Sequence, residues 1–95
     1  MDRLEREEVY RMAVACFGKP PQKLMAIEEM SELTKAICKD FRGKLDMKNL
    51  VEEMADVQIM LDQLKIIYDA HEAVDAAMEL KIKRLRQLLN MDMDE

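Results

Sequence analysis

Glycine and proline, the residues that most often end a helix, occupy only four positions in this 95-residue chain. These positions are Gly18, Pro20, Pro21 and Gly43. Elsewhere apolar residues recur every three or four positions, and no segment alternates apolar and polar residues as a strand does. The sequence therefore predicts an all-α protein made of a few long helices.

Four helices are expected from the periodicity, over about residues 2–17, 21–41, 46–68 and 71–89, with a frayed tail at 91–95. Asp46 is placed to cap the third helix. Short connections favour antiparallel neighbours, so residues 1–95 are predicted to form one domain, an antiparallel four-helix bundle of helical hairpins. A core of this size is small, and assembly as an oligomer would bury more surface.

Composition and charge exclude several classes of function. The net charge is −5, with no broad basic surface for a nucleic-acid partner. No apolar run approaches the ~20 residues of a membrane span, and the charged N-terminal segment does not resemble a signal peptide. Cys16 and Cys38 lack a CxxC spacing and are expected to be reduced thiols. A cytoplasmic location is expected.

Two pairs of acidic residues occupy helix positions where apolar residues are expected. In the second helix Glu29 and Glu32 project beside the predicted apolar stripe, which consists of Ala26, Met30, Leu33 and Ile37. In the third helix Glu53 shares a row with apolar residues, and Asp56 lies at the edge of that row. All four carboxylates are thus predicted to point to where the two helices meet.

Buried carboxylates without a positive partner are costly, and four of them would repel one another. A divalent cation relieves both costs, and ligands that are all oxygen select Mg²⁺, or Mn²⁺, rather than zinc. A di-iron bundle would need histidines within such motifs, and His71 is the single histidine. One ExxE motif alone usually marks a solvated face. Two motifs directed inward favour a metal site of Glu29, Glu32, Glu53 and Asp56.

The last helix carries two cations on or beside its apolar stripe, which consists of Val74, Met78, Leu85 and Leu88. Lys81 falls within the stripe and Arg84 at its edge. Lys81 could extend along the bundle to water or pair with an inward acid. The alternative is that both cations bind phosphate oxygens.

These motifs resemble those of a known family. The pattern EExxE, twenty residues, then ExxD, which reads here Glu28-Glu29-Met30-Ser31-Glu32 and Glu53-Met54-Ala55-Asp56, is similar to that of the MazG-like all-α NTP pyrophosphatases. The segment FGKPPQKLMAIEEMSELTKAI also resembles the single-domain members, and the likeness covers about residues 17–88.

The resemblance implies a homodimer or homotetramer that cleaves a nucleoside triphosphate between its α and β phosphates, releasing a nucleoside monophosphate and pyrophosphate. It implies Glu29, Glu32, Glu53 and Asp56 as Mg²⁺ ligands. Lys81 and Arg84 would bind phosphate.

Glu32 or Glu53 would orient or deprotonate the attacking water. Two alternatives stay open: a relative of phosphoribosyl-ATP pyrophosphatase, and a non-catalytic helical interaction protein on the same scaffold.

Overall fold

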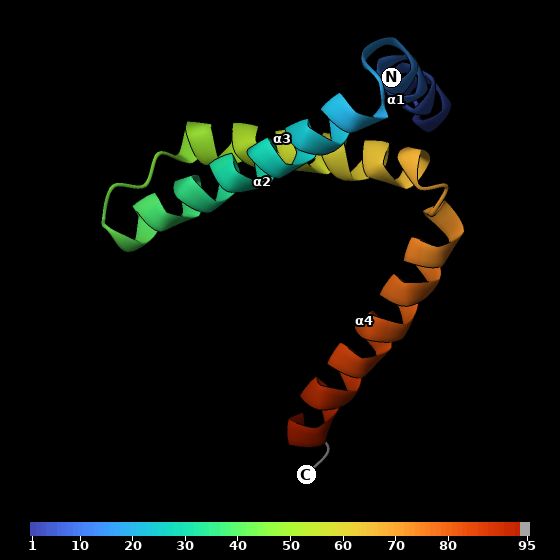
Figure 1. Cartoon of the computed structure of the whole chain (residues 1–95). Coiled ribbons are helices and arrows are strands. Elements are labelled where there is room, and N and C mark those ends of the chain that lie inside the picture. Colours follow the sequence, from blue (N-terminus) through green and yellow to red (C-terminus); the bar gives the residue numbers. More distant parts are fainter. Residues whose placement is uncertain (94–95) are drawn as a thin grey trace.

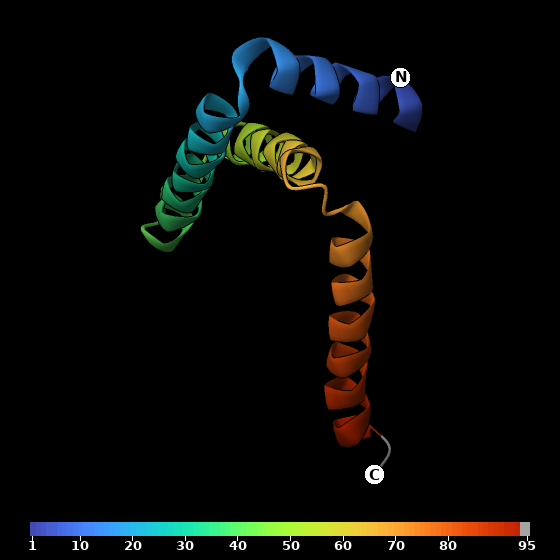
Figure 2. The same cartoon turned by 45° about the vertical axis from the view of Figure 1, so that its right-hand side comes forward.

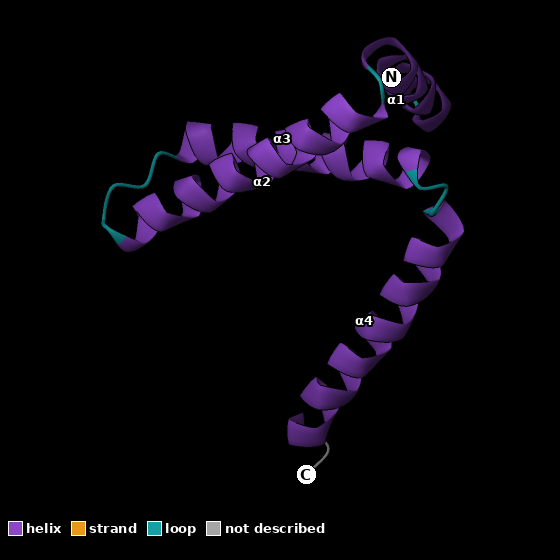
Figure 3. Cartoon of the chain, in the orientation of Figure 1, coloured by secondary structure: helices purple, strands orange, loops and turns teal. Residues whose placement is uncertain are grey.

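A computed structural model describes residues 1–93 of the chain, which form four helices and no strand (Figures 1 and 3). The helices are α1 (Arg3–Phe17), α2 (Lys19–Phe41), α3 (Met47–Ile67) and α4 (His71–Met93). The all-α prediction and the number of helices are confirmed for these residues. Within the same range, no helix combines the length and the apolar character that crossing a bilayer requires.

Local chemistry explains where the first helices begin and end. Asp2 caps α1: its carboxylate accepts a hydrogen bond from the backbone N–H of Glu5, whose side chain accepts one from Asp2 in return. Gly18, at a φ of +91°, separates α1 from α2. The second helix starts two residues earlier than predicted, at Lys19, because the first turn of a helix tolerates Pro20 and Pro21.

The second and third helices form a hairpin that is the centre of the fold. After a five-residue loop, α3 runs back alongside α2 (Figures 1 and 2). Gly43 closes the end of α2 at a φ of +71°, and Asp46 caps α3 as predicted, accepting a hydrogen bond from the backbone N–H of Asn49 at 3.1 Å. The first helix packs across this hairpin and buries Val14 against it.

The contact between α2 and α3 differs in detail from the predicted stripe. Ala26 and Ala36 are almost fully buried, whereas Met30 and Ile37 remain 41% and 44% exposed. The prediction that Met30 and Ile37 belong to the core is therefore wrong for the single chain. Small alanine side chains let the two helix backbones approach closely, so α2 turns its alanines rather than its larger residues toward α3.

The fourth helix leaves the hairpin after a turn at residues 68–70 (Figure 2). Among the described helices, α3 is the only one whose backbone lies close to the backbone of α4. The chain is consequently elongated, with a radius of gyration of 16.8 Å, where a compact domain of this length has about 12 Å. One chain by itself does not close an antiparallel four-helix bundle. Helix α4 also continues to Met93, beyond the predicted start of the frayed tail, and residues 94–95 lie outside the described part.

Candidate functional site

Three carboxylates converge between α2 and α3. One oxygen from each of Glu29, Glu53 and Asp56 lies within 4.8 Å of the other two. Glu29 and Glu53 are half-buried and Asp56 is exposed at the rim of the group. These three residues, hereafter the carboxylate cluster, come from the two motifs that the sequence singled out.

Helix geometry places these acids opposite one another. Glu29 lies on the buried stripe of α2, one turn after Ala26 and two turns before Ala36. Glu53 and Asp56 lie one to two turns before Met60, which is 5% exposed in the core of the hairpin. Because α3 runs back along α2, these turns face each other across the hairpin.

The electrostatics of the cluster are unfavourable in the chain alone. Burial raises the pKa of Glu29 above its ordinary value of 4.5. Asp56 raises the pKa of Glu29 further, because its charge repels the ionised form of Glu29 and its carboxylate can accept a hydrogen bond from the protonated form. The charges of Glu53 and Glu32 also raise this pKa. The Oε2 atom of Glu53 is buried and has no hydrogen-bond partner among residues 1–93.

No lysine or arginine compensates this charge in the part of the chain that the structure describes. Ion pairs there join other acids, and none includes a member of the carboxylate cluster. A buried acceptor left without a partner costs about 1–3 kcal/mol. The cluster is therefore short of a positive partner.

The fourth predicted ligand, Glu32, lies one turn from Glu29 but outside the cluster. Its side chain is 52% exposed, and its Oε1 atom lies 3.5 Å from the ammonium nitrogen of Lys35. An exposed ion pair of this kind contributes little to stability. Glu32 thus remains accessible at the edge of the site, next to the three converging acids.

The predicted phosphate-binding cations lie elsewhere in the single chain. Lys81 and Arg84 are exposed on α4, and Lys81 is about 15 Å along that helix from its first residue. Because α4 diverges from the hairpin (Figures 1 and 2), its own chain keeps both cations apart from the cluster.

Comparison with known proteins does not identify this chain. No protein-family model, curated protein or solved structure matches it.

Two buried glutamines form a feature that the sequence analysis missed. Gln22 on α2 and Gln63 on α3 are 3% and 6% exposed, and the side-chain oxygen of each has no hydrogen-bond partner among the described residues. Both lie on the stripes that carry the acids, Gln22 one turn before Ala26 and Gln63 one turn after Met60. Extending those stripes by one turn in the sequence would have indicated them.

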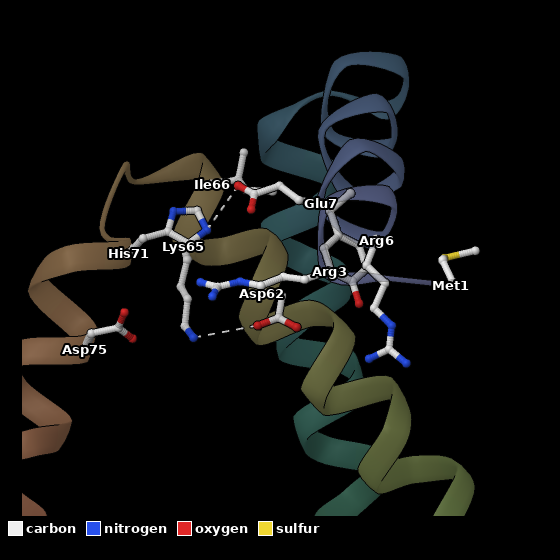
Figure 4. Close-up of a pocket in the computed structure, with 10 residues that line it drawn as sticks. Met1, Arg3, Arg6, Glu7, Asp62, Lys65, Ile66, His71 and Asp75 are labelled. Atoms are coloured by element: carbon white, nitrogen blue, oxygen red, sulfur yellow. Dashed lines mark ion pairs between the residues drawn. The ribbon is translucent and has the colours of Figure 1, made fainter.

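A second missed feature is a pocket of about 260 Å³ where α1, α3 and the start of α4 meet (Figure 4). His71 lies 3.5 Å from Glu7 across this pocket, and Lys65 lies 3.7 Å from Asp62. Arg3 extends into the same space. Positive and negative groups alternate around the pocket, so it has no dominant charge that would select an anion or a cation. Its side chains instead connect the first residue of α4 to α1.

Proposed function

We propose that this protein is a Mg²⁺-dependent nucleoside triphosphate pyrophosphohydrolase that works as a homo-oligomer, a dimer or a tetramer. The observation that carries the proposal is the buried, unpartnered Oε2 atom of Glu53 within a cluster of three carboxylates. The resemblance of the EExxE and ExxD motifs to the MazG-like pyrophosphatases supports the choice of substrate. Mn²⁺ is an alternative metal, and the proposed location is the cytoplasm.

The cluster fits a hard divalent cation. Mg²⁺ binds oxygen at about 2.0–2.1 Å, so oxygens on opposite sides of the ion are about 4.2 Å apart. Among three ligands at most one pair can be opposite, and adjacent ligand oxygens are about 2.9 Å apart. The three oxygens of the cluster, all within 4.8 Å of one another, would therefore move closer together by side-chain rotation to hold the ion. Glu29, Glu53 and Asp56 would hold the ion, and Glu32 could join them by leaving Lys35.

A bound divalent cation would supply charge neutralisation for the triphosphate and a lower pKa for the attacking water. In the proposed reaction the water oxygen forms a bond to the α-phosphorus. The bond from that phosphorus to the oxygen bridging the α and β phosphates breaks, and pyrophosphate leaves with the electron pair. A carboxylate takes the proton of the water. Glu32 suits this role because its carboxylate is exposed beside the cluster, whereas Glu53 is half-buried within it.

The direct test is to incubate the full chain with each of the eight common NTPs and dNTPs and with phosphoribosyl-ATP, in the presence of Mg²⁺. Release of pyrophosphate and the corresponding monophosphate supports the proposal, and the preferred substrate separates the two enzymatic alternatives. Release of orthophosphate instead would show cleavage at a different bond. No turnover of any of the nine compounds would refute the catalytic proposal.

A non-catalytic interaction protein is the second candidate, and one observation favours it. Every side chain from Asp75 to Asn90 on α4 is exposed, including several large apolar residues. Exposed apolar surface of this extent marks a site of interaction between proteins. Metal binding without pyrophosphate release would support this candidate.

A further inference from the structure

The fourth helix has a surface that its own chain leaves uncovered. Met78, Leu85 and Leu88 on its apolar stripe are 50%, 56% and 63% exposed. Leu80, Ile82 and Leu89 are more than half exposed as well. A single helix separated from other elements is marginally stable in water, and most helical stability comes from packing an apolar face. Helix α4 therefore requires a partner surface.

The whole chain shows the same excess of exposed surface. It exposes 7836 Å², whereas a compact monomer of 11.1 kDa exposes about 5700 Å². The excess, roughly 2000 Å² per chain, would correspond to an interface of roughly 4000 Å² between two chains. Interfaces of obligate homodimers have this size. A second copy of this chain is thus a sufficient partner.

The turn before α4 argues against this helix folding back on its own hairpin. The backbone N–H of Ala70 donates to the carbonyl of Lys65 at 2.8 Å, and that of Asp69 donates to Ile66 at 3.2 Å. Asp69 has a φ of +50°. These features define a Schellman motif, a specific helix end rather than a loose linker. The Nε2 atom of His71 also lies 3.5 Å from Oε1 of Glu7, a contact that joins the first residue of α4 to α1. Both contacts direct α4 away from the hairpin.

Charge and register indicate where α4 would lie on a second copy. Residues 81–86 include four cations, and the two acidic motifs of the hairpin include five carboxylates. Counted from Asp69, Lys81 lies twelve residues along α4 and Asp56 thirteen residues back along α3. Arg84 and Glu53 lie fifteen and sixteen residues away in the same two directions. When α4 packs antiparallel to an α3 with its first residue beside the end of that α3, these cations and acids share one level.

We propose that two copies of the chain exchange α4, so that the α4 of each copy packs against the hairpin of the other. The exchange brings Lys81 and Arg84 of one copy to the carboxylate cluster of its partner. Exchange of an identical element keeps the antiparallel register and closes the assembly with two-fold symmetry. The assignment of both cations to phosphate rests on the proposed function, whereas the exchange of α4 does not.

Cross-linking tests the exchange without any assay of activity. In a background of Cys16→Ser and Cys38→Ser, one chain carries Met54→Cys and a second chain, extended by a tag, carries Leu85→Cys. The two chains are mixed, refolded together and treated with a short bis-maleimide. Exchange predicts a product that contains one chain of each kind. The matched control replaces Leu85→Cys by Lys83→Cys, on the opposite face of α4, and should cross-link several-fold less.

Two other outcomes would overturn the exchange. A chain carrying both Met54→Cys and Leu85→Cys would show an internal cross-link, with no product between chains, if α4 folds back on its own hairpin. Absence of cross-linking together with sedimentation as a monomer would show that α4 stays free.

Mixing inactive variants tests whether the exchanged helix completes the site. Copies with Glu53→Gln are combined with copies that carry both Lys81→Ala and Arg84→Ala. Random pairing of equal amounts makes half of the dimers mixed. In each mixed dimer one site carries both changes and the other site carries none, so about a quarter of wild-type activity should return. No recovery, although cross-linking shows the exchange, would refute a shared site. An inactive wild type with the same cross-links would refute the proposed function and leave the exchange standing.

Discussion

Glu53→Gln should make the metal-free protein more stable and remove its response to Mg²⁺. The substitution keeps the shape of the side chain and deletes one of the charges held within 4.8 Å of one another. Two charges at that separation repel by about 0.9 kcal/mol in water and by about 3.5 kcal/mol at an effective dielectric constant of 20. Because Asp56 is exposed at the rim of the cluster, solvent screens part of this repulsion, and we expect a gain of about 1–3 kcal/mol.

The measurement is thermal unfolding followed by far-ultraviolet circular dichroism, at one protein concentration, in chelator and then in Mg²⁺. A gain of 1 kcal/mol raises Tm by about 4–8 °C in a domain of this size. Mg²⁺ at a hundred times its Kd stabilises the wild type by about 2.7 kcal/mol. We therefore expect the variant to melt above the wild type in chelator, and its advantage to vanish or reverse in Mg²⁺.

The matched control is Glu52→Gln, which removes a charge from an exposed neighbour on the same helix. This control should change Tm little in chelator and should keep the response to Mg²⁺. A lower Tm for Glu53→Gln in chelator would show that the carboxylate makes a stabilising contact, and an unchanged response to Mg²⁺ would place the metal elsewhere. Either result would refute the argument from the buried Oε2 atom.

Three further predictions concern Glu29, Gln63 and Lys81. Because the pKa of Glu29 is raised in the folded chain, its contribution to stability is present below pH 4.5 and is lost as pH rises through the folded pKa. In chelator, the Tm of the wild type minus that of Glu29→Gln should therefore fall as pH rises from 4.5 through the folded pKa. A difference in Tm that does not change with pH would contradict this prediction. Gln63→Met should raise Tm by several degrees, because it removes a buried unpartnered oxygen at similar volume; a lower Tm would show that the amide makes a useful contact. Lys81→Ala should raise KM or lower kcat at least tenfold, while the Kd for Mg²⁺, measured by calorimetry, stays unchanged. Lys83→Ala is the exposed control. Equal losses of nucleotide binding and metal binding would indicate a structural role for Lys81.

Much of the hairpin could be predicted because its determinants are local. Gly18, Gly43 and Asp46 end or begin helices through their own backbone or side-chain chemistry, and the structure places them at those ends. The inward direction of Glu29 and Glu53 follows from the helical repeat alone. These signals need no knowledge of the partner surface.

The arrangement of the helices was less accessible from the sequence. A helical repeat indicates an apolar face but not which part of it meets a neighbour, so Met30 and Ile37 were wrongly expected in the core. The turn before α4 depends on Asp69 at a positive φ, which aspartate adopts less readily than glycine. Nothing at that position indicated a specific helix end, and so the direction of α4 could not be foreseen.

The five-residue loop between α2 and α3 also bears on the order in which the protein forms during synthesis. A hairpin with so short a loop brings its helices together through contacts close in sequence, and such contacts form early and fast. The ribosome completes α3 before α4, so under the proposed metal binding and the proposed exchange of α4 a nascent chain could bind the ion before it pairs with a second copy. Newly made chains would thus load the ion first and pair last.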